Sequence, residues 1–105
     1  MRRNTSTMNL NKLMKQAQKM QEQMAKTQAE LESKTVEVSA GGGKVKVTAN
    51  GAGDVLAIKI DKEVVDPSDV EFLEEIVLSA VQQAVEQGKA LAQSEMSKIT
   101  GGLGL

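Results

Sequence analysis

The sequence predicts a two-layer α+β fold with the element order α-β-β-β-α, in which a three-stranded antiparallel meander lies between two long helices. Three patterns support this prediction. Apolar residues recur in sevens over residues 10–31, three short stretches alternate polar and apolar residues within 35–60, and an apolar stripe at helical spacing runs over 69–100. The length of 105 residues is typical of one domain.

The first helix is expected to begin after Asn9, a residue type that caps helix N-termini, and to extend for about 37 Å over about 25 residues. Its apolar residues form two companion rows of a heptad repeat, which is the pattern of a helix packed along another helix. We expect this seam to form a dimer interface. Its residues are Leu10, Leu13, Ala17, Met20, Met24 and Leu31.

The three strands are expected over residues 35–39, 44–48 and 55–60, each with one apolar and one polar face. Gly41-Gly42-Gly43 predicts the first turn, and at least one of these glycines should have a positive φ. Asn50-Gly51 predicts the second turn, because this dipeptide is the strongest short signal for a hairpin.

The second helix is expected over about 69–100, after a connector with one helical turn at 62–65. Ser68 and Glu71 have the spacing of a capping box. Phe72, the only aromatic residue, is expected to face the core. Gly88 costs about 1 kcal/mol inside a helix, so it indicates either a close approach of another helix or a bend.

The expected organisation is a disordered leader over 1–7 (or an upstream start ahead of Met8), one domain over 8–100 and a flexible tail over 101–105. The chain has no Cys and no His, which removes thiolate chemistry and the usual general base. We therefore expect no enzymatic activity, metal, cofactor or small-molecule substrate. No apolar run is long enough to span a membrane. The apolar stripes of the two helices are longer than a sheet of such short strands, so a monomer would leave part of each stripe exposed. This predicts a homodimer.

Charge is distributed unevenly along the chain. Residues 1–34 hold seven basic and three acidic residues, 7 − 3 = +4, while residues 35–105 hold six and eleven, 6 − 11 = −5. Lys12, Lys15 and Lys19 share one helical face, where like charges repel. They are also expected near the positive end of the helix dipole, where cations are disfavoured. Such a row indicates a polyanion partner.

Several ordered strings resemble the YbaB/EbfC family of bacterial nucleoid-associated proteins: Leu13-Met-Lys-Gln-Ala-Gln-Lys-Met-Gln21, Gly41-Gly-Gly43 with Val45-Lys-Val-Thr48, Asn50-Gly51, and Ile58-Lys-Ile-Asp61. The set covers about residues 8–105. The resemblance implies a small cytoplasmic dimer in the nucleoid that binds DNA and has no catalytic activity. On this basis and on charge, the expected contacts to duplex DNA phosphates, with little sequence preference, are Lys12, Lys15, Lys19, Arg2, Arg3 and Lys98.

The same residues are open to other interpretations. The lysine row could be an ordinary solvated face, with Glu22 pairing with Lys19 and Lys26. The glycine turn fails the pattern of a phosphate loop because Val45, not Ser or Thr, follows Lys44. The acidic residues of the connector lack the spacing of a calcium loop. The alternative function is that of a dimeric adaptor for a replication or recombination protein, which the acidic second part of the chain favours.

Overall fold

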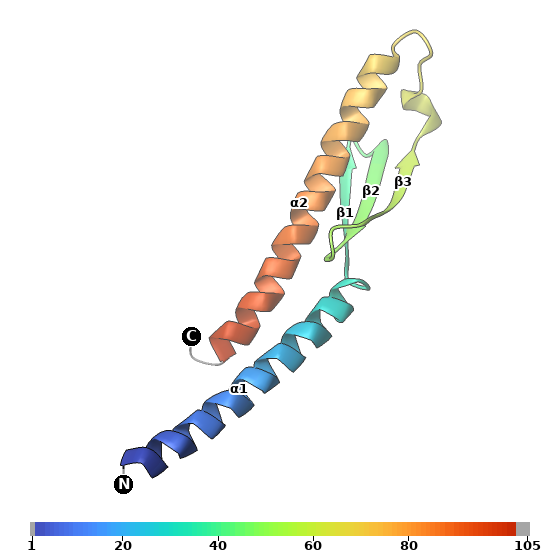
Figure 1. Ribbon diagram of the computed structural model, residues 1–105. Coiled ribbons are helices and arrows are strands. Elements are labelled where there is room, and N and C mark those ends of the chain that lie inside the picture. The colour runs from blue at the N-terminus through green and yellow to red at the C-terminus, as the bar shows by residue number, and fades with distance from the viewer. Residues whose placement is uncertain (1, 103–105) are drawn as a thin grey trace.

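The computed structural model describes residues 2–102, with side chains from residue 9 to 101, and confirms the α+β fold (Figure 1). The chain is elongated, with extents of 81 × 18 × 16 Å. The elements are α1 (Arg2–Leu31), β1 (Thr35–Ala40), β2 (Val45–Asn50), β3 (Val55–Ile60), the 3₁₀-helix η1 (Lys62–Val64) and α2 (Val70–Gly102). The N-terminal half of α1 extends past the end of α2, so this half projects from the body of the molecule.

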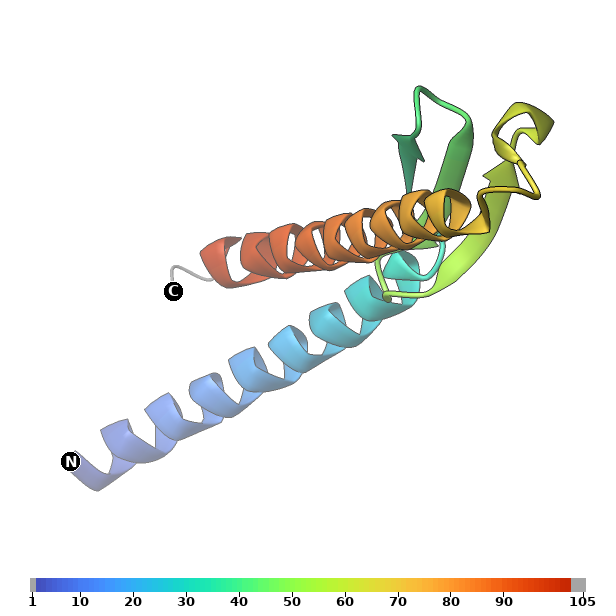
Figure 2. The same cartoon turned by 90° about the horizontal axis from the view of Figure 1, so that it is seen from above.

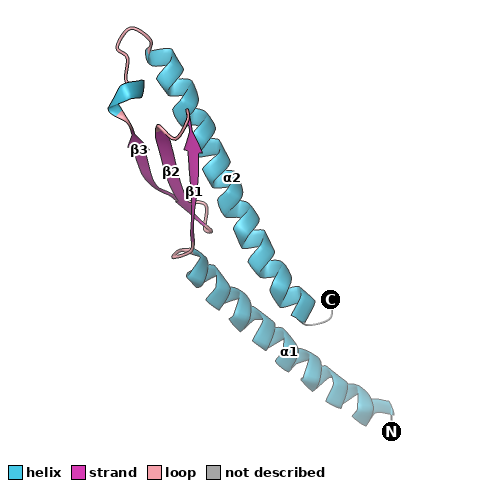
Figure 3. Cartoon of the chain, turned by 180° about the vertical axis from the view of Figure 1, so that it is seen from behind, coloured by secondary structure: helices cyan, strands magenta, loops and turns pink. Residues whose placement is uncertain are grey.

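The strands form the predicted antiparallel meander in the order β1-β2-β3 (Figure 3). Val38 of β1 pairs with Val47 of β2, and Val47 also pairs with Ile58 of β3, its neighbour on the opposite strand. A bulge at Thr48/Ala49 shifts the register between β2 and β3, and the sequence pattern did not predict it. Because directly opposite residues share a face, the pairing places the valines of β1 and β2 on one side of the sheet.

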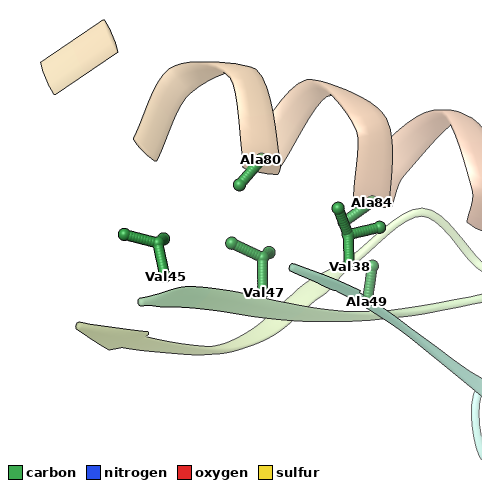
Figure 4. Packing of buried hydrophobic residues seen from close by; sticks show 6 residues of the cluster. All are labelled: Val38, Val45, Val47, Ala49, Ala80 and Ala84. Atoms are coloured by element: carbon green, nitrogen blue, oxygen red, sulfur yellow. The ribbon is translucent and has the colours of Figure 1, made fainter. Parts of the chain in front are cut away.

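The core lies between α2 and the first two strands. Val45, Val47 and Ala49 are completely buried, as are Ala80 and Ala84 of α2 (Figure 4). Their spacing explains the packing, since every second residue of β2 and every fourth residue of α2 faces the same layer. The small side chains let the helix lie close to the sheet, but they also make this core modest in size.

The apolar face of β3 is not covered in the same way. Ile58 and Ile60 share the face of the buried valines by register, yet they are 45% and 42% exposed. From behind, β3 is the strand that lies farthest from α2. Phe72 is 53% exposed, so the expectation that it faces the core of its own chain is wrong.

Both helix starts differ from the prediction. Helix α1 begins at Arg2, so Asn9 lies inside the helix and is not its cap. The backbone over residues 2–7 is helical where a leader was expected, whereas the division into leader, domain and tail stays a prediction. Helix α2 is capped by Asp69, whose Oδ1 accepts a hydrogen bond from Phe72 N at 3.3 Å. Ser68 instead donates its hydroxyl to Asp66, at 2.6 Å.

The first turn follows the prediction. Gly41, Gly42 and Gly43 all have positive φ, at 61°, 70° and 86°. The left-handed region disfavours residues with a Cβ, so three consecutive glycines are the natural solution.

Candidate nucleic-acid interface

The lysine row lies on the projecting part of α1. The side chains of Lys12, Lys15 and Lys19 are all exposed. Within the described side chains, none of the three has a carboxylate within ion-pair distance. Glu22 and Lys26 also make no ion pair there, so the expected neutralisation of Lys19 by Glu22 is absent. The row is therefore an unpaired positive face.

The position of the row relative to the helix start differs from the expectation. The helix dipole acts mainly on the first turn. Because the helix starts at Arg2, Lys12 lies well beyond that turn. The dipole therefore does not oppose the row, and the expectation that it does is wrong. Repulsion along the face remains, at about 0.2–0.5 kcal/mol for each pair. Arg2 and Arg3 form the first turn of α1, but their side chains lie outside the described residues.

The direction of α1 is fixed by a joint at its C-terminal end, formed by Leu31, Glu32, Lys34, Asn50 and Gly51. Asn50 Nδ2 donates to Glu32 O at 3.1 Å. Gly51 N donates to both Leu31 O and Lys34 O, at 2.9 and 3.0 Å. These bonds attach the end of α1 to the β2–β3 turn, and they satisfy carbonyls that a helix terminus leaves free.

Asn50 is the centre of the joint. It is only 3% exposed, and every polar atom of its side chain is bonded. Its Oδ1 accepts from Ala52 N and Asp54 N, at 3.1 and 2.9 Å. The side chain therefore both shapes the β2–β3 turn and holds the end of α1, which no apolar residue of similar size could do.

Two glycines make room for the joint. A Cβ on Gly51 would come closer than 3.0 Å to Leu31, and a Cβ on Gly88 would come equally close to Asn50 O. Gly51 has no positive φ, so the Asn-Gly pair acts through packing rather than through the predicted hairpin turn geometry. Gly88 is explained by a strand carbonyl, not by the helix or the bend that was expected.

A cleft of about 400 Å³ separates α1 from α2 near this joint. Glu95 lies in it and accepts from Lys34 and Lys98, each at 3.4 Å. The Lys34 hydrogen bond, helped by the charges of both lysines, lowers the pKa of the Glu95 carboxyl below its ordinary 4.5. A lowered pKa stabilises the folded state above pH 4.5, and this contribution is lost as the pH falls through the lowered value. Lys98, a predicted DNA contact, is thus already engaged with a carboxylate.

The predicted dimer seam changes character along α1. Leu10 and Leu13 are 56% and 59% exposed, whereas Met20 and Met24 are half-buried. Leu31 is 3% exposed because it packs against Gly51 of its own chain. Leu31 therefore belongs to the joint and has no surface left for a second subunit.

A second apolar surface, formed by β3 and the start of α2, was not predicted from the sequence. A hollow of about 440 Å³ lies there, lined by Ile60, Leu73, Glu74, Val77, Leu78 and Val81. Leu78 is 58% exposed and Leu56 is 53% exposed. Val55–Ile60 carries apolar residues on both faces, and that signal could have identified the surface. Among the described helices, none is long and apolar enough to cross a membrane. No group of potential metal ligands occurs in the same residues.

The chain is similar to known proteins over nearly its whole length. The YbaB/EbfC DNA-binding family matches residues 6–103. A nucleoid-associated protein of Ruminiclostridium cellulolyticum is 57% identical over 96 residues, covering 91% of this chain and 84% of that protein. A nucleoid-associated protein of Clostridium novyi is 53% identical over 98 residues, covering 93% and 86%.

The fold has a counterpart among solved structures. The crystal structure of an uncharacterized protein of Helicobacter pylori matches with a TM-score of 0.63 at 19% identity, over 74% of this chain and 90% of that one. At this identity the match concerns the fold alone. The extent of the family match, together with relatives above 50% identity along nearly the whole length, leads to one conclusion: the chain belongs to the YbaB/EbfC DNA-binding family.

Proposed function

We propose that this protein is a nucleoid-associated protein that binds duplex DNA by contacting phosphates, with little sequence preference. The observation that supports this most directly is the unpaired row of Lys12, Lys15 and Lys19 on the projecting half of α1. Ammonium groups on a protruding helix can approach a phosphate backbone without obstruction from the body. Contacts of this kind position a protein on DNA but carry no sequence information.

We rank the other predicted contacts by where they lie. Arg2 and Arg3 belong to the same helix and would extend the row toward its N-terminal end. Lys98 would have to leave Glu95 before it could contact DNA, so we assign it a minor role. The chain has no Tyr or Trp, and its one Phe, the half-exposed Phe72, lies at the start of α2 and not on the helix of the lysine row, so duplex DNA is a better fit than a single strand that needs aromatic stacking.

We further propose that two copies associate as a homodimer. Among the described residues only seven apolar side chains are buried, three of them alanines, which is a small core for a chain of this length. Exposed apolar groups gather on the β3–α2 surface, and the start of the seam is also exposed. Contiguous apolar surfaces of this kind mark interfaces. The proposed interface combines Leu10, Leu13, Ala17, Met20 and Met24 with the β3–α2 surface.

Sedimentation tests the dimer. The wild type should sediment as a dimer at micromolar concentration, and Leu78→Glu should dissociate it or unfold it. Leu13→Glu with Met20→Glu tests the seam in the same way. Gln83→Glu, an exposed position on a different face of α2, controls for added charge. A stable, well-folded wild-type monomer would exclude this part of the proposal.

A gel shift separates DNA binding from the adaptor alternative. Two duplexes of unrelated sequence should bind with similar affinity at low salt, and both complexes should weaken steeply at moderate salt because bound counterions are released. An adaptor for another protein should show no salt-sensitive shift with either duplex. That outcome would favour the adaptor, which the acidic second part of the chain supports.

A further inference from the structure

A second basic site lies on the face of the sheet that points away from α2. Residues 35–105 carry six lysines and no arginine, and four of the six fall between residues 44 and 62. Through Glu63 the same stretch has three carboxylates, Asp54, Asp61 and Glu63, which gives 4 − 3 = +1 over 44–63 against −5 for the whole of 35–105. Basic charge is therefore concentrated at one place in an acidic body.

The register brings two of these lysines together. Lys46 of β2 lies directly opposite Lys59 of β3. Directly opposite residues share a face with Cβ atoms about 5 Å apart, and like charges in this position destabilise a sheet. Both side chains are exposed. Within the described side chains neither has a carboxylate at ion-pair distance.

A third lysine, Lys44, lies beside these two. A hollow of about 250 Å³ is lined by Gly43, Lys44, Lys46, Lys59, Ile60 and Asp61. Lys44 is paired with Glu63, and Asp61 Oδ1 accepts Glu63 N at 2.9 Å. Glu63 is thus paired with a cation, whereas the carboxylate of Asp61 keeps its charge at the edge of the hollow. Lys46 and Lys59 remain as the free cations of the described part of this face.

The face is open to a large partner. Val45 and Val47 point to α2, so Lys46, which lies between them, points to the opposite side. From above, α2 crosses one side of the sheet only (Figure 2). The proposed dimer uses the apolar face of β3 and therefore leaves the lysines uncovered. The sheet lies beyond the C-terminal end of α1, whereas the N-terminal half of α1, which carries the lysine row, projects away from it.

We propose that Lys46 and Lys59 bind backbone phosphates of a second duplex segment, so that the protein bridges DNA. This proposal rests on the proposed function, in which α1 contacts the first segment. The two positive surfaces lie on different elements, the sheet and the projecting half of α1. A like-charge pair that weakens the sheet is relieved when a phosphate lies between the ammonium groups.

The test combines two sets of substitutions: Lys46→Gln with Lys59→Gln, and Lys12→Gln with Lys15→Gln and Lys19→Gln. Lys89→Gln, an exposed lysine of α2, is the control for loss of charge. The first readout is binding to the immobilised duplex, for which the slope of log K against log salt should stay at the wild-type value in the Lys46/Lys59 variant, because these lysines contact the other duplex. The second readout is capture of a labelled duplex by protein bound to an immobilised duplex.

The expected result is that the Lys46/Lys59 variant folds as well as the wild type, still binds the immobilised duplex and no longer captures the second one. Wild-type capture of the second duplex by this variant would overturn the proposal. A reduced slope with normal capture would also overturn it, because the two lysines would then lie on the same duplex as α1. Failure of the α1 row alone would show as an unchanged slope in the triple variant, and this result is independent of the Lys46/Lys59 measurement.

Discussion

The two ends of α1 differ in their exposure and in what their side chains contribute. The projecting end carries exposed lysines with few contacts, whereas the other end is held by Asn50 and Gly51 through hydrogen bonds and close packing. At the projecting end, a side chain matters for its charge and can be exchanged without disturbing the fold. At the joint, a side chain matters for its shape and hydrogen bonds, and its replacement is costly. The residues proposed to bind DNA are thus separate from the residues that position α1.

The largest loss of stability is expected for Asn50→Ala. The substitution leaves Ala52 N, Asp54 N and Glu32 O without their partner, and each unsatisfied buried group costs about 1–3 kcal/mol. Partial access of water reduces the sum, so we expect a loss of about 2–4 kcal/mol in urea unfolding. Asn11→Ala, at an exposed position on α1, should change stability by less than about 0.5 kcal/mol. Equal stabilities for the two variants would remove the special role of the joint.

Gly42→Val comes next. The residue has φ 70°, and a Cβ at this position would meet nothing within 4 Å, so the cost is backbone strain and not a clash. Non-glycine residues in such conformations cost about 1–3 kcal/mol, which a lowered melting temperature should report. DNA affinity of the folded protein should stay at the wild-type value. An unchanged melting temperature with weakened binding would instead make this turn a contact site.

Gly88→Ala is expected to have a smaller net effect, because two terms oppose each other. Alanine favours the helix by about 1 kcal/mol, while overpacking against Asn50 O costs about 1–3 kcal/mol. A net loss of about 1 kcal/mol should follow in urea unfolding. Gly101→Ala in the same helix is the matched control, since no atom of the described residues lies within 4 Å of a Cβ there and only the favourable term acts. A stabilised Gly88→Ala variant would show that the close approach to β2 is not tight.

Much of the fold could be predicted because it depends on local patterns. The period of seven over α1 and the alternation in the strands reflect the geometry of single elements, and they placed the five main elements in the right order. The choice of cap was wrong because Ser68 and Asp69 can both cap, and a hydrogen bond between Ser68 and Asp66 decides between them. That bond also lowers the pKa of Asp66.

The joint could not be predicted, because it depends on contacts between distant residues. From the sequence, Asn50 is predicted only to form a turn, and its hydrogen bond to the end of α1 is not evident. Gly88 only weakens the helix in the sequence pattern, and its reason is the close approach of β2. The exposure of β3 has the same origin, since it follows from where α2 crosses the sheet. The lysine row was found from sequence because its signal is charge on one helical face, which needs no tertiary contact.

The smallest effect on stability and the largest on DNA binding are expected for the triple variant Lys12→Gln, Lys15→Gln and Lys19→Gln. Removing a self-repelling row should leave the melting temperature unchanged or slightly raised. The matched control replaces the same three lysines by Arg, which keeps the charge.

The most direct test of the account is the salt dependence of duplex binding by this triple variant. If the row contacts three phosphates, the negative slope of log K against log salt should become less steep by about 2.7 per engaged subunit, equally on unrelated sequences. The Arg control should keep the wild-type slope. A folded glutamine variant with wild-type affinity and slope would contradict the account and leave the row as a solvated face.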